Sequence, residues 1–416
     1  MGMKRERAHD NMPHMKPLLF LAALAAVAVG LAGCATSPAR IHESLLTLDS
    51  HLDVPMVFGV QGWDITDRHG VQGDGSQVDL PRMIEGGLDG GFFAIYIPQG
   101  PLTPEGRAAA RDAALRRMAE IHAMVDRHPD SFAIALTAED ASRIAATGRR
   151  IVYLSMENGY PLGEDPSQLR VFYAGGVRVA GLVHFRNNDL GTSATDATPA
   201  PYPGLTPLGR RWVEEANRLG IVIDESHASD AVLDELLELS RAPIILSHSG
   251  ARAVFDHPRN VDDERLRRIA AHGGVIQVPA YNDYLVTNAP NAQRQAAVAA
   301  ARGVQARTLA DREATQQQLA AIDQRFPIRR GTFEDYMQHL LHVIQVAGVD
   351  HAGIGIDFDG GGGVPGFEDA SDYPKITARL LAAGYSREDL QKIWSGNLLR
   401  VLREARAVSE SLNGHL

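Results

Sequence analysis

Residues 220–227 read GIVIDESH and residues 243–248 read PIILSH, and each stretch is an apolar run that ends in polar groups and a histidine. Between them, residues 230–239 (DAVLDELLEL) place apolar side chains at helical spacing. A strand, a helix and a second strand in this order are typical of two parallel strands joined by a crossover helix. The stretch therefore predicts a parallel sheet covered by helices.

The same alternation extends in both directions along the chain. Strands are expected at 45–53, 91–98, 151–157, 178–184, 220–227, 243–248, 274–281 and 351–359. Helices are predicted at 105–127, 207–219, 230–239, 262–271, 333–348 and 386–406. Parallel strands separated by helices favour a closed (β/α)₈ barrel of the TIM type, although an open, doubly wound sheet has the same periodicity. A weaker run at 132–136 is either a ninth strand or an edge piece.

Six of these runs finish in acids or histidines. The endings are Asp49-Ser50-His51-Leu52-Asp53, Ser155-Met156-Glu157, Leu182-Val183-His184, Asp224-Glu225-Ser226-His227, Leu246-Ser247-His248 and Gly355-Ile356-Asp357-Phe358-Asp359. The carboxyl ends of the strands of a closed barrel meet on one face, where active sites lie. Side chains scattered from residue 51 to residue 357 are therefore expected to meet in one pocket.

The residue types in this pattern indicate a metal centre. A single histidine at a strand end is more often a packed or surface residue than a ligand, so the joint pattern carries the prediction. His51 and Asp53 lie two apart on a strand and therefore point to the same face. With another carboxylate and two more histidines they supply nitrogen and oxygen donors suited to zinc. Five ligands exceed one tetrahedral site that keeps an open position, so two metal ions sharing a bridging carboxylate are expected.

Composition limits the class of protein. The chain has 416 residues, 44% of them hydrophobic and 22% charged, and its net charge is -10 without long runs of one sign. Nucleic-acid binding calls for a clustered basic face, so no nucleic-acid partner is expected. Barrels of this kind use 250 or more residues as one unit, so residues 45–406 are predicted to form a single domain. That domain includes an exposed helical insertion at 291–323, and residues 407–416 are predicted to be a tail.

The N-terminal segment is expected to lie outside the fold. Basic residues precede a small and apolar stretch at 18–32, which suits a signal-peptide core and is too short to span a bilayer. It ends in Leu31-Ala32-Gly33-Cys34, which looks like a bacterial lipoprotein cleavage box. Residues 1–33 are therefore predicted to be a lipoprotein signal peptide, 34–44 a linker, and Cys34 the lipidated first residue of the mature protein. A plain secretory signal in which Cys34 is incidental is the alternative.

Lipidation of Cys34 would place the protein in the bacterial cell envelope, anchored to a membrane and outside the cytoplasm. Ala35 is not the Asp that favours retention in the inner membrane, so the outer membrane facing the periplasm is expected. Cys34 is also the only cysteine in the chain, so no internal disulfide and no cysteine nucleophile are predicted for the mature protein.

From residue 45 to about 404 the chain resembles the membrane (renal) dipeptidase family, in the order of its motifs as well as in their content. The matching stretches are DSHLDVP (49–55), the Glu157 strand, LVHFRNN (182–188), GLTPLG (204–209), NRLG (217–220) leading into 224–227, SHS (247–249), PRNV (258–261), GIDFDG (355–360) and GNLLRV (396–401). The resemblance implies a metal-dependent hydrolase on a (β/α)₈ barrel that cleaves dipeptide substrates. Relatives are commonly dimers, so it leaves a homodimer open.

The resemblance also implies the ligand set. His51, Asp53 and Glu157 would hold one zinc ion. Glu157 would bridge to a second zinc ion, held by His227 and His248. A water shared by the two ions would become hydroxide near neutral pH and attack the peptide carbonyl without a covalent intermediate.

Three further roles follow from the same resemblance. His184 would face the developing oxyanion, Asp357 would handle protons at the substrate amine, and Arg259 would bind the substrate carboxylate. Arg259 lies eleven residues beyond His248, in the loop that leaves the sixth predicted strand, and therefore on the active-site side of the barrel. Asp359, beside Asp357, is expected to shape the glycine loop at 360–363 instead.

Two stretches depart from the pattern of the family. Where the family often has Glu-Gly-Gly-His, this chain has Glu157-Asn158-Gly159-Tyr160. The common Asp-Leu-Ala-His appears here as the DESH of residues 224–227. Both changes keep the proposed metal ligands but alter residues beside them in the pocket wall. The sequence therefore does not predict which dipeptide is preferred or whether D-residues or β-lactams are accepted.

Two other functions remain as alternatives. An amidohydrolase acting on cyclic amides, lactones or phosphotriesters commonly begins with His-x-His and has a bridging modified lysine, whereas this chain has His-x-Asp and Glu157. A surface lipoprotein that binds without catalysis would not need to retain every proposed ligand.

Overall fold

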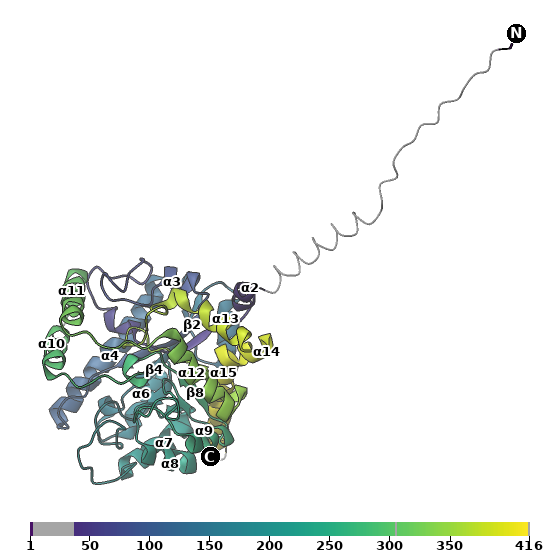
Figure 1. The fold of residues 1–416 in the computed structure, drawn as a ribbon. Helices are drawn as coiled ribbons and strands as arrows, with labels where there is room; N and C mark the ends of the chain where they lie inside the picture. The colour runs from purple at the N-terminus through teal and green to yellow at the C-terminus, as the bar shows by residue number, and fades with distance from the viewer. Residues whose placement is uncertain (3–36, 304–305, 415–416) are drawn as a thin grey trace.

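The computed structural model describes residues 1–2, 37–303 and 306–414. In this part of the chain, parallel strands form one sheet in the order β1-β2-β4-β5-β6-β7-β8-β9, and β3 pairs beside the start of β4. The strands are β1 Leu48–Leu52, β2 Gly90–Tyr96, β3 Phe132–Ile134, β4 Arg150–Glu157, β5 Val177–Gly181, β6 Val222–Asp224, β7 Ile245–Leu246, β8 Val275–Val278 and β9 Ala352–Ile354. Helices surround this sheet (Figure 1). The predicted barrel is confirmed, and β3 is an edge piece.

The barrel closes where β9 and β1 meet, and this line of contact is called the seam below. The buried side chain of Asp49 helps to join the two strands there. One isolated parallel bridge joins Leu52 to Phe358 across the seam. The Asp49 carboxylate accepts hydrogen bonds on Oδ2 from the Ile356 backbone N–H at 3.0 Å and from the Tyr373 hydroxyl at 2.6 Å. A side chain of the first strand thus binds the segment that follows the last strand.

Helices connect the strands and cover the outside of the barrel. They are α2 Pro38–Glu43, α3 Leu80–Glu85, α4 Pro104–Arg127, α5 Ala138–Ala145, α6 Leu169–Ala174, α7 Pro207–Leu219, α8 Asp230–Leu239, α9 Asp263–Ala271, α10 Ala292–Arg302, α11 Leu309–Arg325, α12 Phe333–Ala347, α13 Pro374–Ala382, α14 Arg387–Gln391 and α15 Asn397–Asn413. A π-helical turn, Lys392–Gly396, joins α14 to α15.

Local capping fixes the boundaries of several helices where the sequence predicted them. Thr206 caps α7 by accepting the Gly209 N–H, Pro207 occupies the first turn, and Gly220 ends the helix at φ 79°. Ser229 caps α8 in the same way by accepting the Val232 N–H. Both helices therefore have the bounds expected from the sequence.

Apolar side chains fill the amino-terminal end of the barrel, away from the polar strand endings. Ile151 and Tyr153 lie on the same face of β4 as Glu157, six and four residues earlier, and belong to a buried apolar cluster. That cluster also contains residues of the other strands and of α5 and α15: Leu48, Phe92, Val179, Val222, Ile245, Val275, Ile144, Leu398, Val401 and Leu402. The interior of the barrel is therefore apolar at its amino-terminal end, and the polar groups lie at its carboxyl-terminal end.

Several predicted strands are too long. The strands predicted at 178–184, 220–227, 243–248 and 351–359 end at residues 181, 224, 246 and 354. The backbone explains two of these cases, because His227 has φ 75° and Asp357 has φ 68°, values that a strand does not accommodate. His184, His227, His248 and Asp357 consequently lie in the loops that leave the strands rather than in the strands themselves.

The two ends of the chain also differ from prediction. Part of the segment predicted as a linker at 34–44 forms α2, whose buried His42 lies 2.8 Å from the Gly86 carbonyl and 2.6 Å from the Thr377 hydroxyl. Residues 407–413, predicted as a tail, continue α15. The predicted signal peptide, apart from residues 1–2, and Cys34 lie outside the described residues.

The predicted insertion forms the helices α10 and α11, which lie together at one edge of the molecule (Figure 1). Thr308 pairs with Gln61 in a parallel bridge, so the insertion contacts the loop that follows β1. In the part of the chain that the structure describes, no helix combines the length and the apolar character required to cross a bilayer.

Candidate metal centre

The predicted ligands gather at the carboxyl-terminal end of the barrel. His51 lies in β1 and Asp53 directly follows that strand, while Glu157 is the last residue of β4. His227 and His248 lie in the loops after β6 and β7. All five side chains are buried, so the topology brings together groups that are far apart in the sequence.

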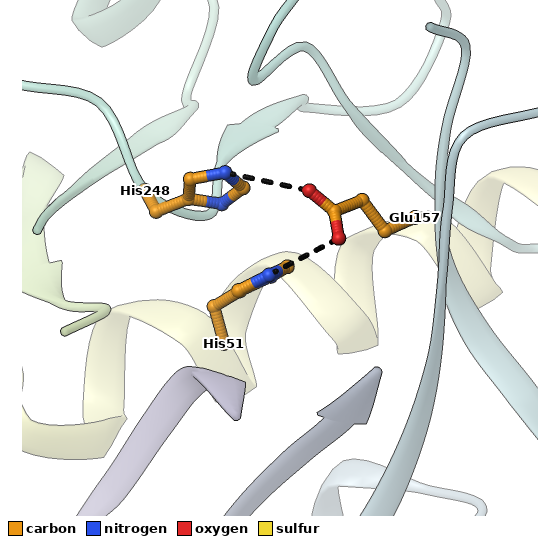
Figure 2. Close-up of side chains that lie close together, drawn as sticks. All are labelled: His51, Glu157 and His248. Atoms are coloured by element: carbon orange, nitrogen blue, oxygen red, sulfur yellow. Dashed lines mark ion pairs between the residues drawn. The ribbon is translucent and has the colours of Figure 1, made fainter. Parts of the chain in front are cut away.

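Glu157 occupies the middle of this group. Its Oε2 lies 3.5 Å from His51 Nε2, and its Oε1 lies 3.0 Å from His227 Nε2 and 3.7 Å from His248 Nε2. Figure 2 shows His51 and His248 facing different oxygens of the carboxylate. The Nε2 atoms of His227 and His248 are only 2.8 Å apart. One carboxylate oxygen thus faces His51, and the other faces the pair His227 and His248.

Two further acids, Asp53 and Asp357, complete the His51 side of the centre. His51 Nε2 lies 3.4 Å from Asp53 Oδ2 and 3.9 Å from Asp357 Oδ1. Gly360 lies against both acids, because a Cβ built on it would be 2.1 Å from Asp53 Oδ2 and 2.2 Å from Asp357 Oδ1. Glycine at this position keeps the space between the two carboxylates open.

The residues present fit a binuclear metal centre. Three sets of donors could each hold an ion: His51, Glu157 and His248; Glu157, His184 and His227; and His51, Asp53 and Asp357. His51 Nε2 and Asp53 Oδ1 are buried without a hydrogen-bond partner among the described residues. Such a group costs about 1–3 kcal/mol when nothing satisfies it, and a cation between these atoms would satisfy both.

Burial dominates the electrostatics of the centre. It raises the pKa of the Glu157 carboxyl above its usual value and that of Asp357 well above. Carboxylates removed from water in this way favour a bound cation as a partner. Burial also lowers the pKa of His227 and of His248 well below the usual value, and the Arg259 charge acts in the same direction. Both imidazoles are therefore neutral near pH 7, which is the form that binds a metal.

His184 stands beside the ligands, held between two aromatic rings. Its ring centroid lies 4.8 Å from that of Tyr96 and 4.1 Å from that of Phe185, and its Nε2 is 3.5 Å from Glu157 Oε1. Burial lowers the pKa of His184 to about 3, so the ring is neutral. The sequence did not predict the two aromatic residues. Tyr96 ends β2, so extending the strand-end pattern to aromatic residues would have found it.

Arg259 is buried behind the histidine pair, on the active-site side of the barrel as predicted. It donates from Nη2 to the His248 carbonyl at 3.0 Å and from Nη1 to the Ser249 hydroxyl at 3.2 Å. Its guanidinium carbon lies 5.1 Å from the ring centroid of Tyr284, which the sequence did not predict as a site residue. The Arg259 Nε atom is buried without a partner among the described residues, so the guanidinium keeps a donor for an anionic group.

The backbone accounts for one departure from the family pattern. Asn158 has φ 73°, a conformation that glycine adopts freely and that asparagine tolerates better than most residues. Its side-chain oxygen accepts the Tyr160 N–H at 3.1 Å and its amide donates to the Ile97 carbonyl at 3.2 Å. Asparagine therefore replaces glycine here while keeping the turn that follows Glu157.

Asp359, at the start of the glycine loop, binds the segment at residues 77–78. Its two carboxylate oxygens accept the backbone N–H groups of Gln77 at 2.8 Å and Val78 at 3.2 Å. The Gln77 side chain in turn donates to the Gly362 carbonyl at 2.8 Å. The loop that contains Gly360 is thus fixed from the neighbouring segment.

Comparison with known proteins gives one consistent family. The profile of membrane dipeptidases (peptidase family M19) matches residues 36–415. The dipeptidase tcpJ of Claviceps purpurea (strain 20.1) is 31% identical over 375 residues, which cover 88% of this chain and 79% of that protein.

Solved structures agree with this family. The probable dipeptidase PvdM from Pseudomonas aeruginosa is 32% identical with a TM-score of 0.76, and the match covers 89% of this chain and 98% of that one. A metallo peptidase from Rhodobacter sphaeroides, solved with a phosphinate mimic of the dipeptide L-Ala-D-Ala, is 26% identical with a TM-score of 0.66, and the match covers 86% of this chain and 99% of that one. The chain therefore belongs to the membrane dipeptidase family, peptidase family M19, and is a metallo-dipeptidase.

Proposed function

We propose that this metallo-dipeptidase holds two zinc ions and hydrolyses the peptide bond of free dipeptides. His51, Asp53 and Glu157 would bind one ion, and Glu157, His227 and His248 would bind the other. The position of Glu157, with each oxygen facing a different histidine group, carries the proposal. Zinc is favoured among divalent metals because the donors combine imidazole nitrogens with carboxylate oxygens.

When bound, the two ions would polarise the peptide carbonyl and lower the pKa of water at the site. The protein's own side chains would then do the rest. His184 is neutral and fixed between two rings, so it would donate a hydrogen bond to the developing oxyanion, a contribution of roughly 3–4 kcal/mol in comparable sites. Asp357 would contact the amine of the substrate. It would also take up the proton that the attacking water loses and pass it to the peptide nitrogen that leaves as an amine.

Arg259 would select short substrates. A free carboxylate one residue beyond the scissile bond would pair with its guanidinium, and that pairing is strong where water is partly excluded. The metallo peptidase from Rhodobacter sphaeroides was solved with a mimic of a dipeptide, which supports dipeptides as the substrate class of this chain.

The test replaces the bridging acid. Glu157→Gln keeps the size of the side chain but removes its charge, so it should lose most dipeptidase activity and lower bound zinc from about two per chain toward one or none. Metal content by mass spectrometry, together with hydrolysis of a small dipeptide panel, checks this.

Glu225→Gln is the matched control. Glu225 is also a buried acid at this end of the barrel, but it belongs to none of the three donor sets. Burial raises the pKa of the Glu225 carboxyl well above its usual value. Full activity and unchanged zinc in Glu157→Gln would refute the bridge. A wild-type protein that binds zinc but cleaves no dipeptide would favour a binding lipoprotein instead.

We also propose that the mature protein is a lipoprotein of the bacterial outer membrane, anchored through Cys34 and facing the periplasm. Support comes from the sequence: Cys34 ends an apolar stretch, and the family match begins two residues later at residue 36. Cys34→Ala should leave the precursor uncleaved or release the protein into the soluble fraction, because the lipid needs that thiol. Unchanged fractionation with normal processing would contradict the anchor.

We also propose a homodimer, and sedimentation of the detergent-solubilised protein tests it.

A further inference from the structure

Beneath the metal centre, buried Ser247 contacts the ring of His248 at Nδ1, and buried Asp224 contacts Ser247 in turn. The Ser247 hydroxyl oxygen lies 2.8 Å from His248 Nδ1 and 2.5 Å from Asp224 Oδ2. Asp224, Ser247 and His248 are 4%, 1% and 1% exposed. Water therefore has little access to this chain of contacts, and the three groups must satisfy one another.

The orientation of Asp224 is fixed by the backbone. Its Oδ1 accepts the Ser226 N–H at 3.0 Å and the Ser247 N–H at 2.9 Å. Both partners are donors, so this oxygen must be an acceptor. The other oxygen, Oδ2, is thereby directed at the Ser247 hydroxyl.

The proton positions follow from this arrangement. The Ser247 hydroxyl donates its single proton to Asp224 Oδ2. The Ser247 oxygen is then an acceptor toward His248 and calls for a proton on Nδ1. A neutral imidazole with its proton on Nδ1 has a lone pair on Nε2, the atom that faces Glu157 and His227.

We propose that Asp224 and Ser247 are positioning residues that fix the tautomer of His248 with Nε2 free to bind a metal ion. Hydrogen bonding of this kind to a ligand histidine typically changes metal affinity 10- to 100-fold. His227 has no equivalent support, because its Nδ1 is buried without a partner among the described residues. The inference rests on the proposed function for the identity of the metal, but not for the position of the proton.

The decisive variant is Asp224→Asn, which reverses the hydrogen bonds without changing their geometry. The Asn oxygen must stay with the two backbone donors, so its NH₂ group faces Ser247. The hydroxyl then gives its proton to His248 Nδ1, and Nε2 carries the imidazole proton and cannot bind zinc. We expect zinc affinity to fall roughly 100-fold in Asp224→Asn but only about tenfold in Ser247→Ala. Ser247→Ala removes the hydrogen bond that keeps the proton on His248 Nδ1, but it does not move that proton to Nε2.

The double variant separates this effect from general damage. Without the Ser247 hydroxyl, the Asn amide can no longer change the hydrogen bond at His248 Nδ1. Asp224→Asn with Ser247→Ala should therefore bind zinc as Ser247→Ala does, more tightly than Asp224→Asn alone. Ser155→Ala is the control, since the Ser155 hydroxyl is also buried in the barrel but has no hydrogen-bond partner in the described structure. It should bind zinc like the wild type.

Zinc affinity is measured by competition with a chelator, and the tautomer by ¹⁵N histidine NMR of the metal-free proteins, with the His248 signals identified by their loss in His248→Gln. The wild type should carry the proton on Nδ1, and Asp224→Asn on Nε2. The inference is overturned if wild-type His248 is protonated on Nε2, if Asp224→Asn binds zinc like Ser155→Ala, or if the double variant is the weakest binder. A wild type that binds no zinc would refute the proposed function, while the NMR result would still decide the inference.

Discussion

At the scale of single residues, the centre depends on backbone conformations that side chains rarely adopt. Asn158, His227, Asp357 and Asp359 have φ values of 73°, 75°, 68° and 67°. Each such residue costs about 1–2 kcal/mol, and the surrounding hydrogen bonds offset that cost. The Asp357 carbonyl, for example, accepts the N–H groups of Gly360, Gly361 and Gly362 at 3.2, 3.2 and 2.7 Å. The turns direct side chains into the centre directly after the strands end.

Arg259 gives a prediction on substrate length. Wild-type enzyme should cleave a dipeptide roughly 10- to 100-fold faster, in kcat/KM, than the C-terminal amide of the same dipeptide, because an amide loses a charged hydrogen bond. Arg259→Ala and Arg259→Lys should lose this preference while keeping their zinc, since lysine cannot form two parallel bonds to a carboxylate. Equal wild-type rates on acid and amide would show that Arg259 does not bind the carboxylate.

Gly360 gives a prediction about space. Alanine at this position would place Cβ about 2 Å from oxygens of both Asp53 and Asp357, so the acids must move apart. Gly360 has no positive φ, so strain in its own backbone does not enter. Gly360→Ala should lower zinc content and reduce activity at least tenfold, whereas Gly70→Ala, whose Cβ would meet nothing closer than 4.0 Å, should not. Wild-type zinc content and activity in Gly360→Ala would refute the prediction that the site needs glycine at residue 360.

At the scale of secondary-structure elements, the seam between β9 and β1 positions His51 and Asp357 relative to each other. Asp49 accepts the His51 N–H on one oxygen at 2.8 Å and the Ile356 N–H on the other at 3.0 Å. A carboxylate is the only side chain of this size that accepts on both sides. The same residue therefore closes the barrel and sets the distance between the two halves of the site.

Asp49→Asn tests this closure. Whichever way the amide turns, its NH₂ group meets a backbone N–H, so one buried donor is left without an acceptor. The free energy of unfolding should fall by about 2–3 kcal/mol, measured by urea denaturation of the metal-free protein. Tyr373→Phe, which removes only the hydroxyl bond to Asp49, should cost about 1 kcal/mol. Equal stability of Asp49→Asn and wild type would mean that Asp49 is not needed to close the barrel.

The sequence predicted elements well where local chemistry decides them. α7 and α8 begin at Thr206 and Ser229 caps and have their expected bounds. The prediction from sequence overestimated the length of the strands before His227 and Asp357, because an apolar run does not reveal where the backbone changes to positive φ. The ligand candidates were found from residue type and strand position. Gly360 and Tyr284 were missed because their roles depend on contacts made only after the barrel closes. Tyr96 was missed because the strand-end pattern was limited to acids and histidines.

At the scale of the whole molecule, the proposed metal ions would link segments from β1 to the loop after β9. Since the unfolded chain cannot present these ligands together, bound zinc should stabilise the native state by RT ln(1 + [Zn]/Kd), about 2.7 kcal/mol at a free concentration of 100 Kd. Removal of metal with a chelator should lower the unfolding midpoint, and added zinc should restore it. Glu157→Gln should respond less. An unfolding midpoint that does not change with chelator would count against metal ions that join these segments.

The order of the strands has a consequence for truncated chains. Each strand of the barrel pairs with the one that precedes it in the sequence, apart from the edge strand β3, so the sheet can form strand by strand from the amino-terminal side. Without Ala352–Ile354, however, β1 and β8 both keep an open edge with unpaired backbone groups, and such edges promote aggregation. A chain cut shortly before residue 352 would form a nearly complete sheet with two exposed edges, which makes such fragments clients for chaperones and proteases.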